Sequence, residues 1–241
     1  MSNRRGSGDR PMTNKLENLA PNLWLLSYPL RMLGVDLRRN VTVMRLSSGK
    51  VIVHSTAPFT ASDAGSISAL GEPAWIVEAL LRHDTFAKEG RRAFPAAKYL
   101  VPDGFAAGGI SAQPLIPAPS EWAAEIAVGS IAGAPEFGEI AMLHRPSNTL
   151  IVADLVVNFA GRQSVWERCL LRLATVRGRH DPGVTRAFKK AINDRDAYAA
   201  SVRTVLAWDF DRIIVGHGTP ILRNGKEKLR AALAAAEVAN F

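Results

Sequence analysis

The chain is predicted to fold as an α/β (α+β) sandwich with mixed β-sheets, on three observations of its 241-residue sequence. Hydrophobic residues make up 47% and charged residues 22%, a balance typical of a globular protein and not of a disordered or fibrous chain. Short apolar runs typical of strands precede Asp154, and apolar residues at helical spacing follow it. The resulting order of strands and helices fits a sandwich better than a strictly alternating doubly wound fold.

The sequence before Asp154 consists mainly of predicted strands. A turn at 47–50 joins two apolar runs into a hairpin, and residues 102–120, rich in Pro, Gly, Ala and Ser, form a connecting stretch. Strands are expected at 23–27, 41–46, 51–53, 75–77, 98–101, 125–128, 139–143 and 149–152. Helices are expected from Ser62 or Asp63 to Leu70 and over 85–93.

Helical spacing begins after Asp154. Trp166, Cys169 and Leu173 recur every three or four residues, so we expect an amphipathic helix with this stripe in the core. The basic residues between them would form its solvent face. The remaining elements are expected as a helical stretch over 188–206, a strand over 212–215 and a closing helix over 225–238.

The net charge of +8, with a pI of about 10.1, comes from two segments. Residues 1–15 hold four basic residues against one acidic residue, and residues 162–203 hold ten against four, so the rest of the chain is about neutral. Nucleic-acid binding by 162–203 is disfavoured because the segment has few aromatic residues and no recognised binding motif. Binding of a basic amphipathic helix to a membrane surface stays open as an alternative.

The charge pattern also suggests a domain organisation. We expect 1–15 to be a disordered basic leader, with translation starting at Met1 or Met12. Residues 16–241 would form a single domain with a basic helical insertion at about 160–207.

Several classes of protein are excluded or disfavoured. No uncharged apolar run reaches the roughly 18 to 20 residues of a membrane span. The single cysteine, Cys169, excludes an internal disulfide framework and a Cys-rich zinc cluster. No apolar signal-peptide core is present, so the expected location is the cytoplasm. The phosphate-binding glycine loops and the G-x-S-x-G nucleophile elbow are absent as well.

Polar side chains that can carry chemistry follow four of the predicted strands. They are His54, the pair His83 and Asp84, Asp154, and His217 between two glycines. Strand ends of this kind can meet at one edge of a sandwich, where ligand sites collect. Because His and Asp are ligands for zinc, iron and manganese, a metal site at that edge is predicted.

Three segments, 94–98, 149–154 and 213–218, together with the strand order, resemble the metallo-β-lactamase fold. The resemblance covers roughly 20–240 and is closest to a family of bacterial proteins classed as a domain of unknown function, DUF4336. It implies a four-layer αββα sandwich, in which two mixed β-sheets pack face to face with helices outside. A mono- or dinuclear metal site would lie at one edge.

The resemblance fails at the first metal motif, H-x-H-x-D-H. With His83 on its first position, Thr85, Ala87 and Lys88 stand where the second His, the Asp and the last His are expected. Lys88 would add a positive charge that disfavours a second cation. The usual Asp-Thr-Gly is also replaced, by a segment that starts with His54, and we place His54 and Lys88 in the substrate pocket.

The histidine expected just before the strand at 139 is missing too. Residues 133–138 contain none, and His144 follows that strand at a turn, where we expect it on the surface. His83, Asp154 and His217 therefore remain as the implied ligands.

The resemblance then implies a hydrolase with a small-molecule substrate and a degenerate site for at most one zinc, iron or manganese ion. Asp154 or Asp84 would position or deprotonate the water. A non-catalytic relative that binds a small molecule or a partner, with or without a metal, is the alternative. The oligomeric state is not predicted.

Overall fold

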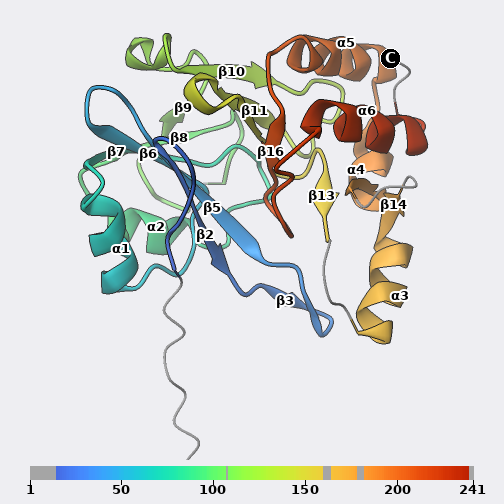
Figure 1. The fold of residues 1–241 in the computed structure, drawn as a ribbon, viewed down its shortest axis with the longest axis horizontal. Coiled ribbons are helices and arrows are strands. Elements are labelled where there is room, and N and C mark those ends of the chain that lie inside the picture. Colours follow the sequence, from blue (N-terminus) through green and yellow to red (C-terminus); the bar gives the residue numbers. More distant parts are fainter. Residues whose placement is uncertain (1–14, 107, 160–163, 178–181, 239–241) are drawn as a thin grey trace, which may run out of the picture.

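The computed structural model describes residues 15–106, 108–159, 164–177 and 182–238. Two β-sheets lie between helices, with α1 and α2 on one side and α5 and α6 on the other (Figure 1). The predicted leader, apart from Lys15, lies outside the described residues. Among the described residues, no helix is long and apolar enough to cross a membrane.

The first sheet has seven strands in the order β1-β2-β5-β6-β7-β8-β9. They are β1 (Glu17–Ala20), β2 (Leu23–Tyr28), β5 (Arg39–Arg45), β6 (Lys50–His54), β7 (Glu72–Val77), β8 (Lys98–Val101) and β9 (Gln113–Pro114). The predicted hairpin at 47–50 is confirmed, because β5 pairs with β6 in antiparallel fashion. From β6 to β9 the pairing is parallel, so these strands end at one edge.

The second sheet has four strands in the order β10-β11-β12-β16. They are β10 (Ile126–Ser130), β11 (Ile140–His144), β12 (Thr149–Ile151) and β16 (Arg212–Ile214). The parallel pair β12 and β16 aligns Ile151 with Ile214. The loops that follow these two strands, which carry Asp154 and His217, therefore leave the sheet side by side.

Shorter strands complete the fold. A hairpin is formed by β3 (Arg31–Met32) and β4 (Val35–Asp36), and a three-stranded sheet by β13 (Val157–Asn158), β15 (Pro182–Thr185) and β14 (Thr175–Arg177). The described part of the predicted helical insertion thus contains strands as well as helices.

The helices begin and end near the predicted positions. They are α1 (Ala61–Ser68), α2 (Ala87–Ala93), α3 (Val165–Ala174), α4 (Arg186–Ala191), α5 (Arg195–Leu206) and α6 (Gly225–Ala235), with 3₁₀ turns η1 (Ser120–Trp122) and η2 (Arg145–Ser147). The cap of α1 is Thr60, whose side chain accepts from the backbone of Asp63 in a capping box. The stretch expected over 188–206 is two helices, because Asp194 caps a new helix with its carboxylate.

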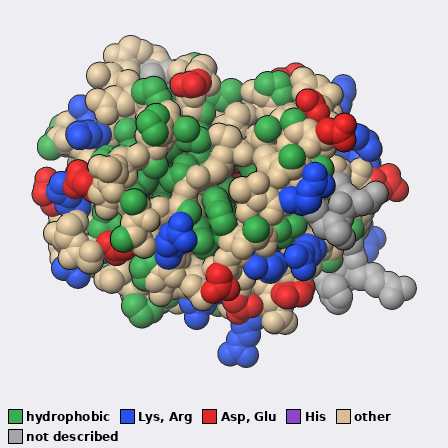
Figure 2. Space-filling view, turned by 90° about the horizontal axis from the view of Figure 1, so that it is seen from above, with side chains coloured by type: hydrophobic (Ala, Val, Ile, Leu, Met, Phe, Trp, Pro, Cys, Tyr) green, Lys and Arg blue, Asp and Glu red, His purple; other side chains and the backbone are tan. Residues whose placement is uncertain are grey.

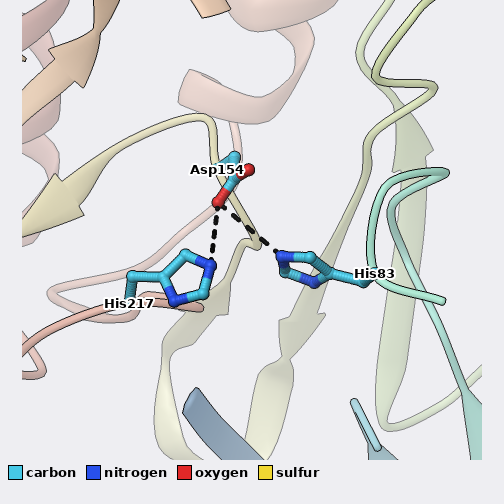
Figure 3. A group of neighbouring side chains, drawn as sticks. All are labelled: His83, Asp154 and His217. Carbon is cyan, nitrogen blue, oxygen red and sulfur yellow. Dashed lines mark ion pairs between the residues drawn. The ribbon is translucent and has the colours of Figure 1, made fainter. Parts of the chain in front are cut away.

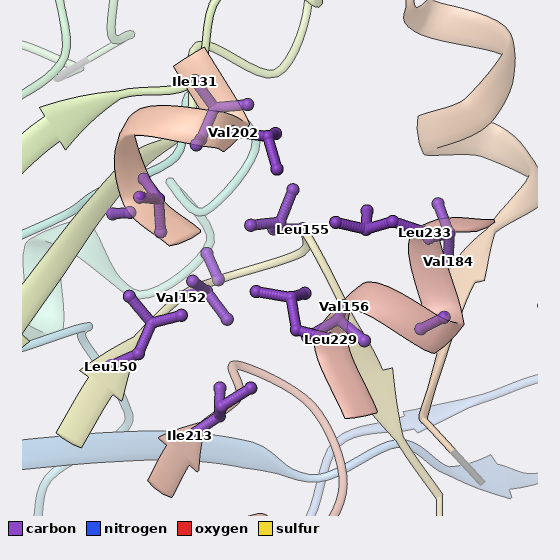
Figure 4. Packing of buried hydrophobic residues seen from close by; sticks show 14 of the residues in the cluster. Ile131, Leu150, Val152, Leu155, Val156, Val184, Val202, Ile213, Leu229 and Leu233 are labelled. Atoms are coloured by element: carbon purple, nitrogen blue, oxygen red, sulfur yellow. The ribbon is translucent and has the colours of Figure 1, made fainter. Parts of the chain in front are cut away.

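Three clusters of buried side chains separate four layers. One lies between α1, α2 and the first sheet and includes Ile67 and Ile76. The second lies between the sheets and includes Trp75 and Met142. The third packs the second sheet against α4, α5 and α6 (Figure 4). The predicted four-layer αββα sandwich is confirmed.

The predicted orientation of α3 is wrong. Trp166 is 62% exposed, Leu173 is 71% exposed, and Cys169 is exposed as well. The helix instead packs through Leu171 on its other side, where Thr175 also donates a hydrogen bond to the Leu171 carbonyl. Spacing identifies the residues that share a face, but the fold decides which face is covered.

The predicted surface position of His144 is also wrong, because its side chain is fully buried. Its Nδ1 lies 2.7 Å from Ser147 Oγ, which donates to Thr149 Oγ1 at 2.9 Å. Thr149 donates in turn to the Ser147 carbonyl. Since Ser147 uses its proton on Thr149, it accepts from His144 Nδ1, and this fixes the neutral tautomer of the ring.

This burial predicts a pH-dependent stability. Desolvation lowers the pKa of His144 from 6.5 to about 4, so the unfolded chain takes up the proton first as the pH falls. Stability from this group is present above pH 6.5 and is lost progressively toward pH 4. By pH 5 the loss is about 2 kcal/mol. Urea unfolding from pH 7 to 5 should show His144→Gln to be less pH-dependent than wild type by this amount. If the free energy of unfolding changed equally with pH in both proteins, the lowered pKa would not belong to His144.

Candidate metal centre

Three side chains from separate loops face one another at one edge of the two sheets (Figure 3). Asp154 Oδ1 lies 3.8 Å from His83 Nε2 and 3.6 Å from His217 Nε2. The two imidazole rings meet edge to face, with centroids 5.3 Å apart. In the view from above in Figure 2, no His side chain of the described residues is visible. The structure therefore brings the three predicted ligands together.

The His217 loop depends on its two glycines. A Cβ on Gly216 would lie 2.6 Å from the Ala153 carbonyl oxygen, and one on Gly218 would lie 2.0 Å from the Asn158 carbonyl oxygen. Gly218 also has a φ of +92°, which favours glycine. The backbone can thus approach the Asp154 loop closely enough for the side chains to meet.

Asn40 connects this loop to the first sheet. Its buried amide donates to the carbonyls of Val215 and Gly218 at 2.8 and 2.9 Å. Ser27 donates to its oxygen at 2.6 Å, which fixes the orientation of the amide. The loop is held from the strand β5 as well as from its own sheet.

The tautomer of His217 follows from its backbone contact. Its Nδ1 lies 2.6 Å from the carbonyl oxygen of Arg38, and a carbonyl only accepts, so Nδ1 carries the proton. Nε2 then presents a lone pair to Asp154. Fixing a ligand imidazole through its other nitrogen is the usual arrangement at metal sites.

His83 is held by a buried ion pair. The Arg39 guanidinium lies 3.2 Å from Glu78 and donates to the Thr56 carbonyl at 3.0 Å and to the His83 carbonyl at 3.5 Å. The Thr56 amide donates to Glu78 at 2.7 Å. Burial, with the charges of Arg39, His217 and His54, holds the pKa of His83 well below its ordinary value. The ring is therefore neutral near pH 7, the form that binds metals.

Asp154 is positioned through its backbone by Glu139. The buried Glu139 carboxyl group accepts from the amides of Ala153 and Asp154 at 2.9 and 3.1 Å. Burial and the charge of Asp154 raise the pKa of Glu139 to about 8, against the opposing effect of these amide donors. Glu139 thus shapes the turn that aims the Asp154 side chain.

The donor set fits one divalent ion. Among the described residues, neither His83 Nε2 nor Asp154 Oδ1 has a hydrogen-bond partner, although both atoms are buried. Unpaired buried polar atoms are costly. Ligand atoms at about 2.1 Å from one zinc ion lie about 3.4 Å apart in a tetrahedral site, close to the two separations from Asp154. The three ligand atoms all lie within 4.8 Å of one another.

The other predicted site residues lie outside this group of three. His54 is buried at the end of β6, and burial with the charge of Arg39 lowers its pKa to about 3. Asp84 and Lys88 are exposed, just before and in α2. Lys88 lies beside Gly108, whose added Cβ would be 3.6 Å from the lysine Cε. The roles assigned to these three residues stay predictions.

Sequence reasoning missed the residues that support the ligands, Glu139, Asn40 and the pair Arg39 and Glu78. Arg39 and Asn40 are the first two residues of β5, whereas Glu78 and Glu139 adjoin apolar strands. Glu78 follows the run 75–77 directly, and Glu139 precedes β11. A charged residue directly next to an apolar strand in the sequence can indicate a buried ion pair or hydrogen bond. When the strand is buried, the charge is buried with it and needs a partner.

A cavity of about 250 Å³ reaches Glu139 at the same edge of the sandwich. Its walls are mixed, with Ile131, Ile140 and Ile116 beside Pro102 and Asp103. The volume is slightly below that of typical ligand pockets.

No protein-family model matches the sequence, and no curated protein matches it. Solved structures do match. A metallo-beta-lactamase from Pontibacter korlensis is 10% identical, with a TM-score of 0.61 over 93% of this chain and 99% of that one. DIM-1 metallo-beta-lactamase is 14% identical (TM-score 0.60, 93% and 97% covered) and TMB-1 is 15% identical (0.61, 93% and 97%). The chain has the metallo-β-lactamase fold.

Proposed function

We propose that the chain is a metal-dependent hydrolase with a degenerate, mononuclear site, closest to the DUF4336 family. The observation that carries the proposal is the convergence of three ligand atoms, from His83, Asp154 and His217, of which two are buried without a hydrogen-bond partner. Zinc, iron and manganese all accept this donor set. When bound, such an ion supplies the Lewis acidity that activates water at neutral pH.

The side chains of the site have separable tasks in this proposal. His217 and His83 supply neutral imidazoles, one fixed through its Nδ1 proton and the other kept neutral by burial. Asp154 turns one oxygen toward both rings and the other away from them (Figure 3), so the second oxygen is available to orient or accept a proton. Asp84, next to His83 and exposed, is the other candidate base.

A small-molecule substrate is supported by the cavity that reaches Glu139, although His83, Asp154 and His217 do not line it. Its volume of about 250 Å³ suits a compact molecule or the leaving part of a larger one. Lys88 and His54 are retained as pocket residues in the proposal. A non-catalytic binding role is the second candidate, because the H-x-H-x-D-H motif is replaced and only three ligands converge in the described chain.

The proposal predicts one bound ion per chain. Purified protein loaded with zinc, iron or manganese should hold about one equivalent by elemental analysis, and Asp154→Ala and His217→Ala should each hold almost none. The matched control is His144→Gln, which removes a buried histidine outside the site and should keep full occupancy. Less than about 0.1 equivalent of all three metals in wild type would contradict a metal site.

Activity separates the two candidate functions. Hydrolysis of p-nitrophenyl acetate or phosphate by the loaded protein, lost in Asp154→Asn with the fold intact, would support the hydrolase. Stoichiometric metal without turnover of either probe would favour the binding role.

A further inference from the structure

The exposed face of α3 is apolar. Val165, Trp166 and Leu173 are 68%, 62% and 71% exposed, and Cys169 lies between them on the same face. At 100° per residue these four positions fall within a single arc of the helix, and Arg168 and Arg172 lie next to this arc on one side. The helix is amphipathic, and its apolar side faces solvent.

The hairpin of β3 and β4 extends this face. Met32 and Leu33 at its tip are 59% and 81% exposed. A Cβ on Gly34 would lie 3.9 Å from Trp166 Nε1, and Figure 1 places the hairpin beside α3. Of the seven large hydrophobic side chains exposed in the described chain, five form this apolar patch: Met32, Leu33, Val165, Trp166 and Leu173.

The margin of the apolar patch is basic. Arg31 in the hairpin and Arg38 just after it are exposed, as are Arg168 and Arg172 on α3. The nearby acids are Asp36 and Glu167, which lie close to each other where hairpin and helix meet, since the Asp36 backbone and charge both act on Glu167. The cations therefore outnumber the acids around the patch, within a segment of the chain that is itself strongly basic.

We propose that the apolar patch docks on an anionic lipid surface. A short helix with Trp and Leu on one face and Arg beside them is suited to the headgroup boundary, where the apolar side chains enter the lipid and the guanidinium groups bind phosphates. A second copy of the chain fits less well, because docking patch to patch would bring like charges together. The proposal does not depend on the metal.

Docking would place the metal centre close to the membrane. The segment between β4 and β5 contains Leu37 and Arg38, whose carbonyls accept hydrogen bonds from Gly218 and His217, respectively. The patch and the His217 loop are thus joined through two residues of backbone.

Vesicle binding of the full chain tests the proposal. Binding to phosphatidylcholine vesicles containing phosphatidylserine should exceed binding to phosphatidylcholine alone, with a blue shift of Trp fluorescence. Leu33→Ser with Trp166→Ser should weaken binding by about tenfold or more. Arg168→Gln with Arg172→Gln should weaken it by about 30-fold on the anionic vesicles. All four positions are exposed, so the fold should be retained, as circular dichroism and urea unfolding would verify.

Leu222→Ser is the matched control, since this leucine is 51% exposed outside the patch and should leave binding unchanged. Four results would overturn the proposal. The first is that the protein does not bind anionic vesicles at low salt, and the second is that binding survives the patch variants and is lost when residues 1–14 are removed. The third is that the protein forms a dimer that Trp166→Ser abolishes. The fourth is that the patch binds an oligonucleotide or an acidic protein in preference to anionic vesicles.

Discussion

Arg39→Met is expected to lower the free energy of unfolding by about 3 to 5 kcal/mol. The side chains of Arg39 and Glu78 are 4% and 0% exposed and lie 3.2 Å apart, so the substitution leaves an uncompensated carboxylate in the core. The Thr56 amide and hydroxyl still donate to Glu78, but they carry no charge. Because domains are stable by only about 5 to 15 kcal/mol, the loss should be large in urea unfolding.

Two variants calibrate this loss. Arg82→Met breaks an exposed pair, with Arg82 52% and Glu136 66% exposed, and should cost less than about 1 kcal/mol. Glu78→Gln added to Arg39→Met removes the stranded charge and keeps an acceptor for Thr56, so the double variant should be more stable than Arg39→Met alone. If Arg39→Met and Arg82→Met lowered the free energy of unfolding by the same amount, the buried pair would contribute no more to stability than the exposed pair.

Most strands of the two main sheets were predictable, because each is a short apolar run bounded by turn residues. The first strand β1, the two residues of β3, the pairing of β13 with β15, and β9 in the connecting stretch were not predicted. Strands this short have no periodicity, and their formation depends on partners far along the chain. The orientation of α3 failed for a related reason, since solvent covers its apolar face instead of another element.

The ligands of the candidate site were predictable because His83, Asp154 and His217 follow strands that end at one edge. Their supporting residues were not, because the role of Glu139 arises from amides 14 and 15 residues away along the chain. The burial of His144 was not predictable either. The sequence places it beside a turn, where an exposed position is expected, but η2 brings it against β12. Local pattern locates chemistry at strand ends, while burial and charge partners depend on tertiary contacts.

Glu139→Gln should weaken metal binding by about 10- to 100-fold while leaving all three ligands in place. The Glu139 carboxyl group uses one oxygen for the Ala153 amide and the other for the Asp154 amide. Glutamine replaces one of these acceptors by an NH₂ group that faces an N–H donor, so one amide loses its partner and the turn before Asp154 relaxes. The cost in stability should be about 1 to 3 kcal/mol. Calorimetric titration with zinc and urea unfolding measure the two effects.

The comparison with Glu125→Gln distinguishes positioning from general support. Glu125 also accepts a backbone amide with both oxygens, from Ser47 at 3.0 and 3.1 Å, but it lies next to β10, whose Ile126 pairs with His144 at the edge opposite the metal centre. Its substitution should leave the zinc dissociation constant unchanged. If Glu139→Gln lowers stability and binds zinc as tightly as Glu125→Gln does, Glu139 supports the core without positioning Asp154. A loss of zinc affinity confined to Glu139→Gln would instead mean that the orientation of Asp154 is set through its backbone, by a glutamate side chain that does not bind the metal.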